Sequence, residues 1–89
     1  MIRRTVHFSG NVQGVGFRYT ARSVAKDFKV VGYVRNLPDG RVELAAEGDQ
    51  AEVGRLIDAI LEKMEGFVRN HTTFDSPPTG EFSDFSVAR

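Results

Sequence analysis

"GNVQGVGFR", residues 10–18, places three glycines within seven positions and ends on an arginine. Before it, residues 2–9 alternate apolar and polar side chains, which is typical of a β-strand. After it, apolar residues recur at helical spacing and form one face of an amphipathic helix (Phe17, Ala21, Val24, Ala25 and Phe28). The stretch therefore joins a strand to a helix, with more glycine than a simple turn needs.

The next segment predicts a β-hairpin. Residues 30–36 are rich in β-branched and aromatic side chains, and the turn sequence LPDG follows them. Residues 41–47 then alternate apolar and charged side chains, as a second strand would.

A second helix and two further strands complete the chain. Asp49 with Glu52 resembles a capping box at a helix start, and apolar residues at helical spacing follow (Val53, Leu56, Ile57, Ile60, Leu61 and Met64). Residues 67–74 indicate a fourth strand, which SPPTG ends. Residues 82–87 indicate a short fifth strand at a sheet edge.

This order of elements predicts an α+β fold, the ferredoxin-like split β-α-β sandwich, with an antiparallel sheet and two helices on one face. The strand–helix–strand crossover makes residues 2–9 and 30–36 parallel, and the third strand lies between them, so they are about 10 Å apart. Their C-terminal ends then share one end of the sheet. We therefore expect Asn36 to lie near the glycine loop.

The 89 residues suit one domain, residues 1–89. No cysteine is present, which excludes disulfides, thiolate metal sites and cysteine-based phosphatase chemistry. The chain has no apolar stretch long enough to span a membrane, and MIRRTVHF lacks the apolar region of a signal peptide. We expect a cytoplasmic monomer.

The formal net charge is zero, but the charges are unevenly distributed. Residues 1–41 contain eight Lys/Arg and two Asp/Glu, whereas residues 42–89 contain four and ten. We expect the two halves to interleave and most of these charges to neutralise one another. A local positive field around the glycine loop would nevertheless suit an anionic substrate. The overall balance does not favour a nucleic-acid partner.

The glycine loop has the composition of an anion-binding site. Consecutive N–H groups converge on one point when some residues are left-handed, a conformation that glycine adopts readily. A helix N-terminus adds partial positive charge, and Arg18 adds a planar cation that matches phosphate. The alternative is that the glycines serve only a tight turn and Arg18 is a solvated residue.

Two familiar nucleotide-binding motifs are absent from the loop. It lacks the Gly-Lys-Ser/Thr ending of a Walker loop, and so the hydroxyl that would hold a metal. It also lacks the third glycine and the acidic ribose partner of a dinucleotide site. Among its side chains, Val12, Val15 and Phe17 are expected to be core anchors, whereas Gln13 either bonds within the structure or faces the ligand.

Residues 10–18 resemble the first signature of the acylphosphatases, Gly-x-Val-Gln-Gly-Val-x-Phe-Arg. "GYVRNLPDGRVELAAEG", residues 32–48, is similar to the second signature of that family. The resemblance covers essentially the whole chain. It implies hydrolysis of small-molecule acyl phosphates to a carboxylate and inorganic phosphate, with no metal or cofactor.

The resemblance also implies the site residues. Arg18 and Asn36 would be catalytic, Arg18 by binding the phosphoryl group and Asn36 by positioning the attacking water. The phosphoryl group would be bound by the whole loop: Gly10, Asn11, Val12, Gln13, Gly14, Val15, Gly16, Phe17 and Arg18. An acyl phosphate has a carboxylate leaving group, so no general acid is needed, and an asparagine orients water without repelling the phosphate.

Two other functions stay open at this stage. A non-catalytic module on the same fold would bind phosphate without turnover. An RNA-binding domain would need aromatic residues on its central strand, and residues 41–47 contain none.

Overall fold

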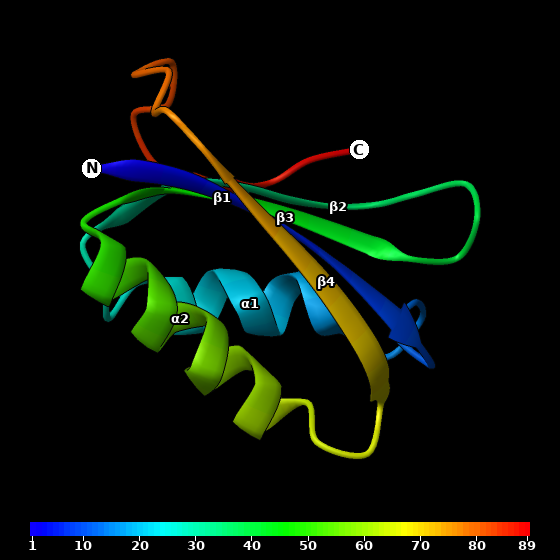
Figure 1. Ribbon diagram of the computed structural model, residues 1–89. Helices are drawn as coiled ribbons and strands as arrows, with labels where there is room; N and C mark the ends of the chain where they lie inside the picture. The colour runs from blue at the N-terminus through cyan, green and yellow to red at the C-terminus, as the bar shows by residue number, and fades with distance from the viewer.

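The computed structural model describes residues 1–89, in which one face of a five-stranded sheet is covered by two helices (Figure 1). The elements follow in the expected order: β1 (Ile2–Gly10), α1 (Phe17–Ala25), β2 (Val30–Asn36), β3 (Val42–Gly48), α2 (Gln50–Lys63), β4 (Val68–Ser76) and β5 (Phe85–Val87). The strand order β4-β1-β3-β2-β5 places β3 between β1 and β2, so the split β-α-β arrangement is confirmed.

The four main strands form the expected antiparallel sheet, and the short edge strand β5 makes the whole sheet mixed. The pairs β1–β3, β1–β4 and β2–β3 are antiparallel, but β5 runs parallel to β2. After β4 the chain crosses to the far edge of the sheet and reverses its direction (Figure 1). Because β4 is itself antiparallel to the direction of β1 and β2, a strand that reverses β4 must be parallel to β2.

The core lies between the sheet and the helices. Val6, Phe8 and Leu44 from the strands are fully buried against Leu56 and Ile60 from α2. Burial of each such side chain stabilises the fold by about 1.5–3 kcal/mol relative to exposure. Neither helix is long and apolar enough to cross a membrane.

Only one of the two hydrogen bonds of the expected capping box forms at the start of α2. The Asp49 carboxylate accepts a hydrogen bond from the N–H of Ala51 at 3.2 Å. The Glu52 carboxylate does not return to Asp49, because it accepts from the N–H of Lys29 at 2.9 Å and pairs with Arg55. Glu52 thus joins α2 to the segment before β2.

The open face of the sheet carries ion pairs that join the two halves of the chain, as expected from the uneven charges. Glu43 accepts hydrogen bonds from the Tyr33 hydroxyl at 2.7 Å and Arg35 Nε at 2.9 Å, and its other oxygen lies 2.8 Å from His7 Nε2. Burial raises the pKa of Glu43, but these partners together lower it below its ordinary value. On the opposite, helix-covered side of β1, next to α2, Arg4 pairs with Asp75 of β4.

Glu47 is a second acidic centre on the open face and is 3% exposed. It accepts hydrogen bonds from the N–H and hydroxyl of Thr79 and from the N–H of Gly80, at 2.7–2.9 Å. Burial raises its pKa, yet these donors and Arg3 outweigh burial and lower the pKa. Glu47 therefore ties the loop after β4 to the middle of the sheet.

Candidate active site

A small hollow of about 100 Å³ lies where β1 passes into α1 and β2 ends. Its lining includes the glycine loop and the residue that ends β2 (Val12, Gly14, Gly16, Phe17, Arg18, Tyr19 and Asn36). Figure 1 shows the β1–α1 connection and the β2–β3 turn at the same end of the molecule, as the crossover geometry predicted. The hollow is smaller than the ~300–1,000 Å³ of sites for drug-sized ligands and suits a compact ion.

Two of the loop glycines are left-handed. Gly14 and Gly16 have φ values of +78° and +76°, and a Cβ added at either position would have no atom within 4 Å. Space therefore does not require glycine at these positions. The backbone conformation does, because a side chain makes it unfavourable.

This conformation leaves a continuous run of main-chain donors without acceptors. None of the N–H groups from Val12 to Tyr19 donates to a backbone carbonyl. The N–H groups that donate to side chains all belong to other segments. The first bond of α1 runs from Thr20 N–H to the Gly16 carbonyl at 3.0 Å. Unpaired donors concentrated in one segment are the arrangement by which proteins bind anions.

The two helices differ at their N-termini. α2 has an Asp49 cap and Glu52 in its first turn, so carboxylates already offset its positive end. The N-cap residue of α1 is Gly16, which supplies no side-chain cap, and the first turn of α1 contains no acidic residue. The partial positive charge of α1 is therefore available to an external anion at the hollow.

Arg18 and Asn36 reach the hollow from different elements. Arg18 is half-buried in the first turn of α1 and forms no ion pair, and its guanidinium carbon lies 6.0 Å from the centre of the Tyr19 ring. Asn36 ends β2 on the same side of the strand as buried Val34, which is the helix side. Arg35 points to the opposite side and pairs with Glu43.

Four residues predicted for the phosphoryl site do not line the hollow: Gly10, Asn11, Gln13 and Val15. Gly10 serves the approach of β4, because a Cβ there would lie 2.6 Å from the Phe67 carbonyl oxygen. The Asn11 N–H donates to the same carbonyl at 2.9 Å.

The apolar anchors beneath the loop are Val12 and Phe17, which are buried as expected. The Phe17 ring packs on Phe8 with 4.9 Å between ring centres. Val15 was expected in the core, but it is 38% exposed, because the left-handed glycines on both sides of it turn its side chain outward.

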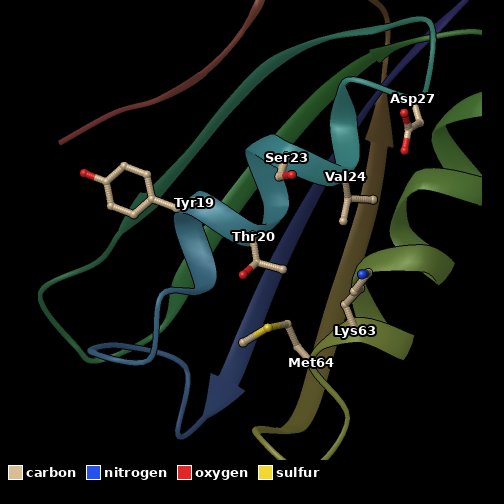
Figure 2. Close-up of a pocket in the computed structure, with 7 residues that line it drawn as sticks. All are labelled: Tyr19, Thr20, Ser23, Val24, Asp27, Lys63 and Met64. Atoms are coloured by element: carbon tan, nitrogen blue, oxygen red, sulfur yellow. The ribbon is translucent and has the colours of Figure 1, made fainter.

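Tyr19 is a lining residue that the sequence reasoning missed. Its only sequence signal is its place next to Arg18 in the first helical turn. Tyr19 also borders a wider groove of about 530 Å³ between α1 and α2. Figure 2 shows the Tyr19 ring pointing away from the other residues of that groove, among them Ser23, Asp27 and Lys63. Neither the glycine loop nor Arg18 lines the wider groove.

The acylphosphatase family model matches residues 4–87. The chain belongs to the acylphosphatase family. An acylphosphatase from Acaryochloris marina is 43% identical over 91% of this chain and 87% of its own length. An acylphosphatase from Methanospirillum hungatei is 44% identical over all of this chain and 99% of its own length. The crystal structure of the Bacillus subtilis acylphosphatase is similar with a TM-score of 0.91, 31% identity and full coverage of both chains.

Membership of the acylphosphatase family means that this chain is an enzyme that hydrolyses acyl phosphates. Acyl phosphates carry an anionic phosphoryl group, whereas the loop presents unpaired N–H groups and the first turn of α1 contains no acidic residue.

Proposed function

We propose that the hollow holds the phosphoryl group of an acyl phosphate, and that Arg18 and Asn36 act on it as the two catalytic side chains. The run of unpaired N–H groups from Val12 to Tyr19 is the single observation that carries this proposal. These donors, the N-terminus of α1 and the Arg18 guanidinium all favour the same ligand, a compact oxyanion. We propose that residues 1–89 act as one catalytic domain. The cytoplasmic location, the monomeric state and the lack of a nucleic-acid partner stay predictions.

The reaction that this site supports is an in-line displacement at phosphorus. The water oxygen forms a bond to phosphorus while the bond from phosphorus to the acyl oxygen breaks, and its electron pair leaves on the carboxylate. One water proton stays on the incoming oxygen, and the other passes to a phosphoryl oxygen. An acyl phosphate dianion and water thus give a carboxylate anion and dihydrogen phosphate, so atoms and charge balance.

Each group has a distinct task in this step. The loop N–H groups and Arg18 stabilise charge on the phosphoryl oxygens, which is where it develops in the transition state. Asn36 offers both a donor and an acceptor to the attacking water, without the negative charge that an aspartate would bring. The leaving carboxylate is a weak base and needs no proton.

Hydrolysis of benzoyl phosphate by the full chain tests the proposal. We expect Asn36→Ala to lower kcat about 100-fold, the cost of a misplaced reactant, with little change in inhibition by inorganic phosphate. Arg18→Gln should lower kcat/KM by about 100- to 1,000-fold and weaken phosphate inhibition as well, because the guanidinium donates both to bound phosphate and to the transition state.

Arg22→Gln is the matched control. Arg22 lies one turn further along α1, is exposed and forms no ion pair, so this variant changes the net charge equally and should keep the parent activity. An Asn36→Ala variant as active as the parent would refute the water-positioning role. Phosphate binding without turnover by the parent would identify a non-catalytic binding module instead.

A further inference from the structure

The side chain of Gln13 leaves the glycine loop and reaches the β2–β3 turn. Its Nε2 donates to the Leu37 carbonyl at 2.8 Å and to the Arg41 carbonyl at 2.9 Å. A side-chain amide nitrogen carries two hydrogens, and here both are used. Because neither carbonyl can donate, the amide nitrogen, and not the amide oxygen, must face them.

These two carbonyls belong to the residues that close the hairpin. The N–H of Leu37 donates to the Arg41 carbonyl at 2.8 Å, and the N–H of Gly40 donates to the Leu37 carbonyl at 3.2 Å. Leu37 directly follows Asn36. Gln13 is therefore hydrogen-bonded to both sides of the turn, directly after Asn36 at the end of β2.

The bonds of Gln13 are the only hydrogen bonds between residues 11–16 and the β2–β3 hairpin. The main-chain bond of Asn11 goes to Phe67, which precedes β4, and the N–H groups that follow it are unpaired. Without Gln13, only van der Waals contacts would fix the distance between the loop and Asn36. Interiors hold side chains by such contacts, but the loop residues Gly14, Val15 and Gly16 are exposed.

We infer that Gln13 is a positioning residue: it holds the end of β2 against the glycine loop so that Asn36 faces the bound phosphoryl group. This inference rests on the proposed function, since it gives Gln13 a task only if Asn36 orients the water. Gln13 itself does not line the hollow and acts through Asn36.

Kinetics of Gln13→Met test the inference, because methionine has a similar length and cannot donate. We expect kcat for benzoyl phosphate to fall about 10- to 100-fold, the range of a reactant displaced by up to 1 Å. Inhibition by inorganic phosphate should change less than about twofold, because the loop N–H groups and Arg18 stay in place. Gln50→Met is the matched control: Gln50 is exposed at the start of α2, and the variant should behave as the parent.

The double variant separates positioning from a general loss of structure. If Gln13 acts through Asn36, then adding Gln13→Met to Asn36→Ala should lower kcat less than about twofold further. A merely structural role would instead reduce kcat by a similar factor in both backgrounds.

Gln13→Glu supplies a pH profile. A carboxylate would face two carbonyl oxygens, and its protonation would restore one donor. The charged side chains of the turn, Arg41 and Asp39, pair with each other at 2.8 Å. We expect the kcat of Gln13→Glu, relative to the parent, to rise as the pH falls from 7 to 5, and the ratio for Gln13→Met to stay flat.

Retention of the parent kcat by a folded Gln13→Met variant would overturn the inference, and so would equal losses in the presence and absence of Asn36→Ala. The proposed function would survive either result if the single variant Asn36→Ala still had a reduced kcat. Failure of Asn36→Ala to reduce kcat would instead refute the proposed function.

Discussion

Alanine at Gly16 isolates the backbone contribution to phosphate binding. Gly16 has φ +76°, and an added Cβ would have no atom within 4 Å, so the substitution causes no clash. Its cost is the left-handed conformation alone, about 1–2 kcal/mol for a residue with a Cβ. For a domain of 89 residues this corresponds to a fall in Tm of several degrees, since about 1 kcal/mol shifts Tm by ~4–8 °C.

The loop can respond in two ways, and each has its own signature. If it keeps the left-handed turn, the protein loses about 1–2 kcal/mol of stability and binds phosphate as before. If it relaxes to a right-handed turn, stability is regained, but the N–H groups around Gly16 no longer converge. Because nothing packs against this position, we expect substantial relaxation: weaker phosphate inhibition and lower kcat/KM, with a loss of stability below the 1–2 kcal/mol ceiling. Gly16→Asn should recover part of the lost phosphate inhibition and part of the lost kcat/KM, because asparagine tolerates the left-handed region better than alanine.

Gly80→Ala is the matched control for this experiment. Gly80 has φ +73° and equally open surroundings, but it lies in the loop after β4, at the other end of the sheet (Figure 1). Urea unfolding followed by circular dichroism, together with benzoyl phosphate kinetics and phosphate inhibition, measures both effects. We expect Gly80→Ala to lose stability with unchanged kinetics. Identical behaviour of Gly16→Ala, with unchanged phosphate inhibition, would refute the reasoning that left-handed glycines aim the donors.

Three further predictions concern the sheet and the pH dependence. Gly32→Ala should destabilise the protein by more than about 3 kcal/mol in urea unfolding, because its Cβ would lie 1.8 Å from the Ala45 carbonyl oxygen within the sheet. A loss of only about 0.5 kcal/mol, as for an ordinary surface change, would contradict this packing. Glu47→Gln should cost about 1–3 kcal/mol at pH 7, because its amide NH₂ would face one of the donors of Thr79 and Gly80. The pKa of Glu47 is lowered from 4.5 in the folded protein, so the unfolded chain binds the proton first, and this stabilisation is lost as pH falls below about 4.5. The variant should therefore show a shallower fall in unfolding free energy in acid than the parent, and an equal slope would contradict the assignment. Finally, kcat should be nearly constant from pH 5 to 8, measured by stopped-flow or discontinuous assay, since neither proposed catalytic side chain is of a type that titrates there; a bell-shaped profile would require an additional acid or base.

The local patterns of the sequence predicted most of the fold and the main parts of the site. Each strand and helix has a period that the backbone geometry dictates, and the split β-α-β topology expected from their order places β3 between β1 and β2. That order alone brought Asn36 beside the glycine loop. The prediction succeeded because it needed only the direction of two strands, and no side-chain detail.

The features that sequence reasoning missed depend on contacts between distant segments. The partners of Glu43 come from two neighbouring strands, and they become adjacent only when the register of the sheet is known. The carbonyl partners of Gln13 lie 24 and 28 residues away in the sequence, so either role open to that side chain was compatible with the motif. Val15 looked like a core residue by type, but the left-handed glycines beside it direct it outward.

The loop joins two requirements that usually conflict, because it must be held rigidly while its N–H groups stay unpaired. Buried Val12 and the packed rings of Phe8 and Phe17 anchor it from below by apolar contacts, which consume no hydrogen-bond donors. Gln13 adds a lateral attachment by donating through its side chain, which again leaves the loop N–H groups free. After Asn11, no attachment of the loop uses one of its N–H groups, and this is why the N–H groups from Val12 to Tyr19 stay free for the anion that we propose they bind.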